Sequence, residues 1–186
     1  IMVGEKGHGN QSFPCSFDFR YYKDIYIVKT NLNGAALWQK THGNEYLEKG
    51  TDIVAKEGGG YIIAGEKCDH GYNISSCDNR AKIILLEIDE DGNSNQETVL
   101  NNLYFFEAGS PISISNTSNG GYVFVSKPKN NGYTWFYKWG QNENSIDLKL
   151  ENAGYGGESI EMSNDGGFII GTSGSTIIKT DQELNF

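Results

Sequence analysis

The chain has 186 residues, a formal net charge of −9, 24 glycines and three prolines. Nucleic-acid-binding proteins normally carry a basic surface, so this acidic balance argues against DNA or RNA as a partner and against direct binding to an anionic membrane. No apolar run approaches the roughly 20 residues that a membrane-spanning helix requires. Abundant glycine, tyrosine and phenylalanine favour short strands joined by tight turns.

One apolar segment returns along the chain, and its three later copies follow a glycine-rich turn. Its copies are residues 1–6 (IMVGEK), 58–67 (GGGYIIAGEK), 119–128 (NGGYVFVSKP) and 165–174 (DGGFIIGTSG). Equivalent positions lie 61, 61 and 46 residues apart, as from Ile62 to Val123 and from Val123 to Ile169. An internal repeat of this length indicates a repeated supersecondary unit.

Three further series of segments interlock with the first and are read as strands. One series ends in a polar turn and comprises residues 24–34, 82–92, 134–144 and 175–185. A second follows that turn at 36–41, 94–100 and 145–150, and a third precedes the glycine-rich turns at 50–56, 110–115 and 158–163. Gly-Gly, Asn-Gly and Asp-Gly pairs suit the hairpins because they adopt positive φ at low cost. No amphipathic stretch of helical period is present.

Four antiparallel strands repeated about every 45 to 60 residues are typical of β-propeller blades. The segments YIIAG (61–65) and KIILLEI (82–88) are apolar on both faces, as a sheet between two neighbours requires. We therefore predict an all-β fold, a β-propeller segment of about three and a half four-stranded antiparallel blades. It would form a single domain over 1–186, with units at about 1–49, 50–109, 110–156 and 157–186. A β-sandwich or a β-helix is the alternative.

Residues 24–43 (DIYIVKTNLNGAALWQKTHG) and 50–67 (GTDIVAKEGGGYIIAGEK) resemble the blades of secreted bacterial β-propeller repeat proteins of Bacteroidetes-like organisms. The resemblance extends over essentially the whole chain but only blade by blade, and the third unit departs from it, since KWGQNENSIDL (138–148) lacks the turn glycine and the later tryptophan. It implies an exported, often surface-attached binding or scaffolding protein and no particular reaction. The patterns of quinone-binding and sialidase propellers are not met, so we expect no cofactor.

Counted in blades, the chain starts at the second strand of one unit and stops after the third strand of another. An open ring would expose apolar faces and unpaired edges. We therefore expect the 186 residues to be a fragment of a larger propeller, or to be completed by another chain.

Extra residues accumulate in the connections 7–23 and 68–81, and functional residues concentrate on such loops. All three histidines of the chain fall on the face that these connections would share. The predicted binding residues on this long-loop face are His8, Asp18, Arg20, His42, Asp69, His70, Asp78 and Arg80. The alternative is that polar loops hold these residues by chance.

The three cysteines are Cys15, Cys68 and Cys77. A disulfide between Cys68 and Cys77 would close one long connection in an exported protein, and Cys15 would then be left over. Free thiols and a zinc site are the alternatives, although a structural zinc site needs four ligands. Residues 89–97 (DEDGNSNQE) have the acidic character of a calcium loop but fit a hairpin turn better.

The sequence carries no catalytic signature and no metal-ligand set. Our first hypothesis is a non-enzymatic binding or assembly module of an exported or cell-surface protein, with a protein or glycan held on the long-loop face. A second is a glycan hydrolase or lyase whose active-site residues lie partly in missing blades, and a third is a structural part of a larger assembly. The aromatic run 133–139 (YTWFYKW) indicates packing between blades rather than a sugar-stacking platform.

Overall fold

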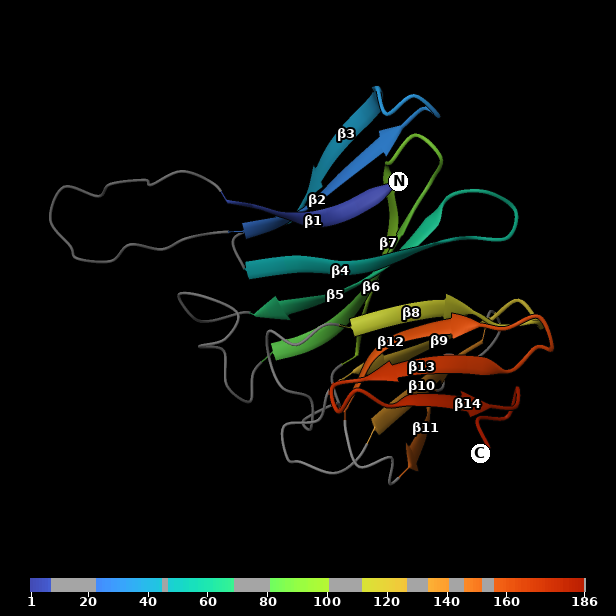
Figure 1. The fold of residues 1–186 in the computed structure, drawn as a ribbon. Helices are drawn as coiled ribbons and strands as arrows, with labels where there is room; N and C mark the ends of the chain where they lie inside the picture. The colour runs from blue at the N-terminus through green and yellow to red at the C-terminus, as the bar shows by residue number, and fades with distance from the viewer. Residues whose placement is uncertain are drawn as a thin grey trace, which may run out of the picture. The chain divides into compact units, whose positions relative to one another are not determined.

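A computed structural model describes residues 1–7, 23–44, 47–68, 81–100, 112–126, 134–140, 146–151 and 156–185 (Figure 1). These residues form fourteen β-strands and no helix: β1 (Met2–Gly7), β2 (Lys23–Thr30), β3 (Ala36–His42), β4 (Leu47–Ala55), β5 (Tyr61–Cys68), β6 (Ala81–Ile88), β7 (Ser94–Leu100), β8 (Ile112–Asn116), β9 (Tyr122–Ser126), β10 (Thr134–Trp139), β11 (Ile146–Glu151), β12 (Gly157–Met162), β13 (Phe168–Thr172) and β14 (Ile177–Thr180). A helix of membrane-spanning length and hydropathy is therefore lacking from the described ranges. Each strand falls on one of the segments predicted from the sequence repeats, so the strand prediction is confirmed.

Side chains of asparagine and aspartate build three of the turns. In each, one side-chain oxygen accepts hydrogen bonds from the backbone N–H groups two and four residues later, at 2.8–3.0 Å. The turns begin at Asn31, Asp89 and Asp181. Their fourth residue has a positive φ, at Gly34, Gly92 and Leu184. The turn at Asp89 joins the antiparallel strands β6 and β7, so the hairpin interpretation of residues 89–97 is confirmed.

The chain divides into two compact units. Unit 1 comprises Ile1–Ile53 and Gly58–Tyr104, and unit 2 comprises Val54–Glu57 and Phe105–Phe186.

Unit 1 contains one mixed sheet with the strand order β1-β2-β4-β5-β6-β7, and β3 pairs with β2 outside this order. Strands β1, β2 and β3 are antiparallel, as are β5, β6 and β7. Strands β2 and β4 run parallel and meet at Lys23 and Leu47. One apolar core cluster of the unit consists of Ile25, Ile27, Ile63, Ile84, Leu86 and Ile88.

The side chains of β2 and β3 hold their hairpin against the β6–β7 turn. The indole of Trp38 and the ammonium of Lys29 donate to the carbonyl of Glu90 at 3.0 and 3.3 Å. Lys40 donates to the side chain of Asn93 at 3.2 Å. These contacts join segments about 50 to 60 residues apart in the sequence. Trp38 also packs against the apolar core cluster of the unit.

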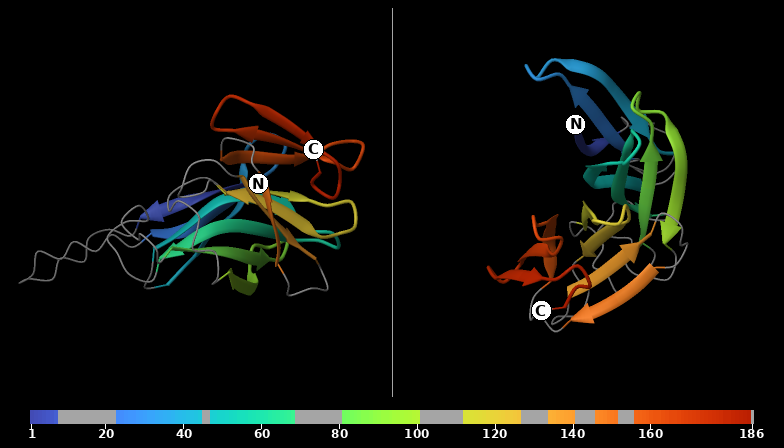
Figure 2. Two further views of the ribbon diagram at one scale, coloured as in Figure 1. Left: turned by 90° about the horizontal axis from the view of Figure 1, so that it is seen from below. Right: turned by 90° about the vertical axis from the view of Figure 1, so that its right-hand side faces the viewer.

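Unit 2 contains a four-stranded antiparallel sheet in the order β11-β10-β9-β8 and a three-stranded antiparallel sheet in the order β12-β13-β14 (Figures 1 and 2). The sheets share one core, to which the first contributes Val123, Val125 and Phe136 and the second Ile160, Phe168 and Ile170, with Leu184 from the last turn. Strand β12 also lies beside β8, where the hydroxyls of two serines accept its backbone N–H groups. The pairs are Ile160 to Ser113 at 3.2 Å and Met162 to Ser115 at 3.0 Å.

The predicted arrangement of about three and a half four-stranded propeller blades is wrong. The first seven strands form one mixed sheet with a parallel contact, the next sheets have four and three strands, and none of the three closes. The repeats describe strands and tight turns, which determine the pairing of neighbours in sequence. They do not specify how one hairpin joins the next, and at Lys23 and Leu47 a backbone contact merges two expected blades into one sheet.

Substituting alanine at Gly60 tests the constraint at the glycine-rich turn. Gly58 and Gly60 both have positive φ (86° and 85°), but a Cβ at Gly60 would lie 2.3 Å from the carbonyl oxygen of Ile88, whereas a Cβ at Gly58 meets nothing within 4 Å. Gly58→Ala should cost about 1 kcal/mol of unfolding free energy from backbone strain alone. Gly60→Ala should cost at least about 2 kcal/mol more, because the β6 backbone must move. Urea unfolding monitored by circular dichroism measures both, and equal losses would contradict the argument.

Candidate functional site

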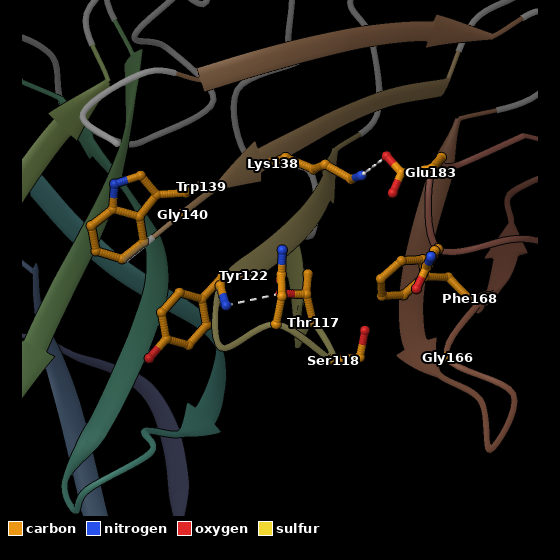
Figure 3. Close-up of a pocket in the computed structure, with 12 residues that line it drawn as sticks. Thr117, Ser118, Tyr122, Lys138, Trp139, Gly140, Gly166, Phe168 and Glu183 are labelled. Carbon is orange, nitrogen blue, oxygen red and sulfur yellow. Dashed lines mark hydrogen bonds and ion pairs between the residues drawn. The ribbon is translucent and has the colours of Figure 1, made fainter. Parts of the chain in front are cut away.

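A cavity of about 370 Å³ lies in unit 2, between the turns of its two sheets (Figure 3). We call it the Trp139 cavity. Its lining comes from the β8–β9 turn, the end of β10, the β12–β13 turn and the turn that follows β14. The lining residues are Thr117, Ser118, Asn119, Gly121, Tyr122, Lys138, Trp139, Gly140, Gly166, Phe168, Gln182 and Glu183.

Two stacked aromatic rings form one wall of the Trp139 cavity (Figure 3). Trp139 and Tyr122 are cross-strand partners on β10 and β9, and their ring centroids lie 5.5 Å apart at an interplanar angle of 29°. Tyr122 is buried, whereas Trp139 is half-buried. Tyr122 therefore supports the indole from behind and leaves part of it open to a ligand.

Opposite charges meet at the rim of the same cavity. The ammonium of Lys138 lies 3.0 Å from a carboxylate oxygen of Glu183, and these side chains are 28% and 67% exposed (Figure 3). Lys138 belongs to β10 and Glu183 to the turn after β14. An ion pair this exposed contributes roughly 0 to 1 kcal/mol, so a ligand could replace it at little cost.

Hydrogen bonds hold the two turns that frame the cavity. The hydroxyl of Thr117 accepts the backbone N–H of Gly121 at 2.9 Å. In the second turn, Asp165 accepts hydrogen bonds from Lys179 and Ser163, which hold the pKa of its carboxyl well below the usual range. Gly121 permits a close approach, because a Cβ there would lie 2.9 Å from the carbonyl oxygen of Trp139. The walls are thus largely pre-formed.

The lining of the Trp139 cavity offers stacking and hydrogen bonding but few reactive groups. It contains hydroxyl, amide, ammonium and carboxylate groups, and neither histidine nor cysteine. Within the described ranges, no group of three or more His, Cys, Asp or Glu side chains could hold a metal ion. This chemistry suits reversible binding.

A second cavity of about 280 Å³ lies in unit 1, and we call it the Glu48 cavity. Ile25 and Leu86 supply apolar walls, while His42, Glu48 and Glu97 supply ionisable groups. Thr41, Gly43, Asn44 and Ser94 complete the lining. The imidazole Nε2 of His42 lies 2.9 Å from the carbonyl oxygen of Gly92.

The carboxylate of Glu48 is almost completely buried, with 1% of the residue exposed. Burial raises its pKa from 4.5 to about 7, although the Lys67 ammonium at 3.7 Å lowers it. The carboxylates of Asp24 and Glu97 raise the pKa further by repulsion. Lys67 lies closer to Glu97, at 3.0 Å, so two carboxylates share one ammonium.

Only one of the eight predicted binding residues lies among the described residues. His42 ends β3 and lines the Glu48 cavity. The others, which lie outside the described residues, are His8, Asp18, Arg20, Asp69, His70, Asp78 and Arg80. The structure therefore leaves their convergence on one face a prediction.

Cys68 ends β5 with its side chain buried and is disulfide-bonded. Cys15 and Cys77 both lie outside the described residues, so the pairing of Cys68 with Cys77 stays a prediction.

The aromatic run 133–139 contains both buried core residues and a residue that lines a cavity. Phe136 and Tyr137 are buried, and burial raises the pKa of Tyr137 to about 12, so these two pack in the interior, although not between propeller blades as predicted. Trp139, at the end of the run, instead lines a cavity. Sequence reasoning missed Lys138, Glu183 and Glu48. The position of Trp139 beside a predicted turn was the one sequence feature that could have indicated the Trp139 cavity.

No family model matches the chain, and no curated protein matches it. One solved structure, of a protein of unknown function from Bacteroides caccae, shares 13% sequence identity with it. The match covers 98% of this chain and 90% of that one, with a TM-score of 0.24. A TM-score of this size carries no argument about fold or function.

The raised pKa of Glu48 predicts a pH-dependent stability. Between pH 4.5 and about 7, the unfolded chain releases the Glu48 proton while the folded chain retains it. The free energy of unfolding should therefore fall as pH rises through this window, by at most about 3 kcal/mol. Glu48→Gln should remove this component, and urea unfolding of both proteins at several pH values measures the difference. Parallel pH profiles for the two proteins would contradict the assignment.

Proposed function

We propose that the protein is a non-enzymatic binding module that holds a glycan in the Trp139 cavity. The observation that carries the proposal is a half-buried indole, supported by Tyr122, beside the polar side chains of the rim. A sugar ring presents apolar C–H groups on its faces and hydroxyls around its edge. Stacking on Trp139 suits the faces, and hydrogen bonds to Lys138, Asn119 and Gln182 suit the hydroxyls.

The size of the cavity supports a small ligand. Ligand pockets commonly enclose about 300 to 1,000 Å³, and the cavity of about 370 Å³ lies at the lower end of this range. Turns held by their own hydrogen bonds reduce the ordering that binding requires. A glycan residue therefore fits better than an extended protein surface.

The carboxylates of the cavity support binding rather than hydrolysis. Most glycoside hydrolases use two carboxylates on either side of the scissile bond. The lining of the Trp139 cavity contains one carboxylate, Glu183, and that group is exposed and paired with Lys138.

An exported or cell-surface location forms part of the proposal. Disulfides persist mainly in oxidising compartments, and the bonded state of Cys68 supports such a location. A glycan is also a ligand that an exported protein commonly meets.

Substituting Trp139 tests the glycan proposal. Trp139→Ala should weaken binding about tenfold, because losing the contact between the sugar face and the indole should cost on the order of 1 to 2 kcal/mol. Trp139→Phe is the matched control and should retain most of the affinity, since its ring can still stack on the ligand. The measurement is a screen on immobilised oligosaccharides, followed by calorimetric titration of the best ligand with each variant. The proposal would be refuted if the protein bound none of the immobilised oligosaccharides, or if the wild type and Trp139→Ala bound the best ligand with equal affinity.

The cysteine pairing can be tested on the protein secreted under oxidising conditions. Peptide mapping by mass spectrometry without reduction should recover a peptide pair linked through Cys68 and Cys77, with Cys15 unlinked within the chain. A link from Cys68 to Cys15 would contradict the predicted pairing and would place the chain's spare thiol at Cys77.

A further inference from the structure

The Glu48 cavity combines buried negative charge with an apolar floor. Glu48 and Glu97 both line it, and Ile25 and Leu86 are buried at 2% and 4% exposure. These residues come from four strands of unit 1: β2, β4, β6 and β7. The cavity is thus built by the sheet rather than by one loop.

Among the described residues, the charged groups at this cavity do not balance. Lys67 provides one ammonium, 3.0 Å from Glu97 and 3.7 Å from Glu48, so the three groups sum to a net charge of −1 when all are ionised. The Asp24 carboxylate adds further repulsion on Glu48. A single additional cation would neutralise the set of Glu48, Glu97 and Lys67.

A second observation concerns the oxygens of Glu48. Both are buried, and neither receives a hydrogen bond of normal geometry from the described residues, although the backbone N–H of Asn44 lies close enough to lower the pKa of Glu48. A buried carboxylate in this state lacks donors that water would otherwise supply, and leaving such a group unsatisfied is costly. Because Glu48 lines an open cavity, a ligand can supply those donors.

We propose that the Glu48 cavity binds a primary ammonium group on a short alkyl chain. The ammonium would donate to Glu48 and Glu97, and the alkyl chain would contact Ile25 and Leu86. Lys67 already holds an ammonium 3.7 Å from Glu48 and 3.0 Å from Glu97, so both carboxylates can pair with this group. An ammonium has three donors and no acceptor, so it matches two carboxylates better than a hydroxyl does.

Two sources of this chemistry are a free alkylamine and the side chain of a lysine in a peptide. The first probe is n-butylammonium chloride, with n-butanol as its uncharged control. The second probe is the peptide acetyl-Gly-Lys-Gly-amide, whose ends carry no charge. Binding of the butylammonium alone assigns the site to free amines, and binding of both assigns it to lysine side chains as well.

Calorimetric titration of the full chain at pH 7 is the test. An ammonium favours the ionised form of Glu48, so binding should release about half a proton, and the apparent enthalpy should change with the ionisation enthalpy of the buffer. Glu48→Gln should weaken binding at least tenfold and abolish the buffer dependence. Glu90→Gln, which removes an exposed carboxylate of the same unit, should bind like the wild type.

The proposal is overturned if neither amine probe binds, if butanol binds as tightly as butylammonium, or if Glu48→Gln retains the wild-type affinity. If Glu48→Gln fails to fold by circular dichroism, the buffer dependence of the wild type decides. Proton release then supports an ammonium beside Glu48, and its absence rules this out.

Discussion

Reversal of the chain within four or five residues is the constraint on which the rest of this structure depends. Each such turn needs a backbone position with positive φ and a partner for the N–H groups that the strands leave unpaired. Glycine supplies the first at Gly34, Gly92, Gly120 and Gly166. Side chains at Asn31, Asp89, Thr117 and Asp181 supply the second. The strands can pair in register only because these turns satisfy their own polar groups.

The turns also make the Trp139 cavity. Its walls are turn residues and strand ends. Trp139 stands at the end of β10, so one face of the indole packs on Tyr122 and part of it stays open. Two residues earlier, Tyr137 stacks on Phe124 at 4.7 Å and is buried. Position along one strand therefore separates a core aromatic from a site aromatic.

The strands and turns of this protein could be predicted because they depend on local patterns. The side chain of Asp89 and the positive φ of Gly92 build their hairpin turn within five residues, and apolar segments such as Tyr61–Cys68 favour burial. The assembly of hairpins depends instead on contacts that leave no mark in a repeat. Trp38 reaches the carbonyl of Glu90, 52 residues away, through a backbone acceptor that any residue would offer. The parallel contact at Lys23 is likewise made by backbone groups, and the blade prediction failed there.

The net charge of −9 affects ligand binding differently at the Trp139 cavity and at the Glu48 cavity. At the Trp139 cavity, Lys138 and Glu183 cancel one another, so the field at the ligand is small and a neutral glycan gains or loses little from the net charge of −9. At the Glu48 cavity, the shared Lys67 leaves a carboxylate uncompensated at close range, where burial reduces screening by salt. A cation is favoured there by both the local and the total charge. Lys67 thus has two opposed effects, because it makes the buried Glu48 carboxylate tolerable beside Glu97 in the folded chain and competes for both carboxylates with any incoming ammonium.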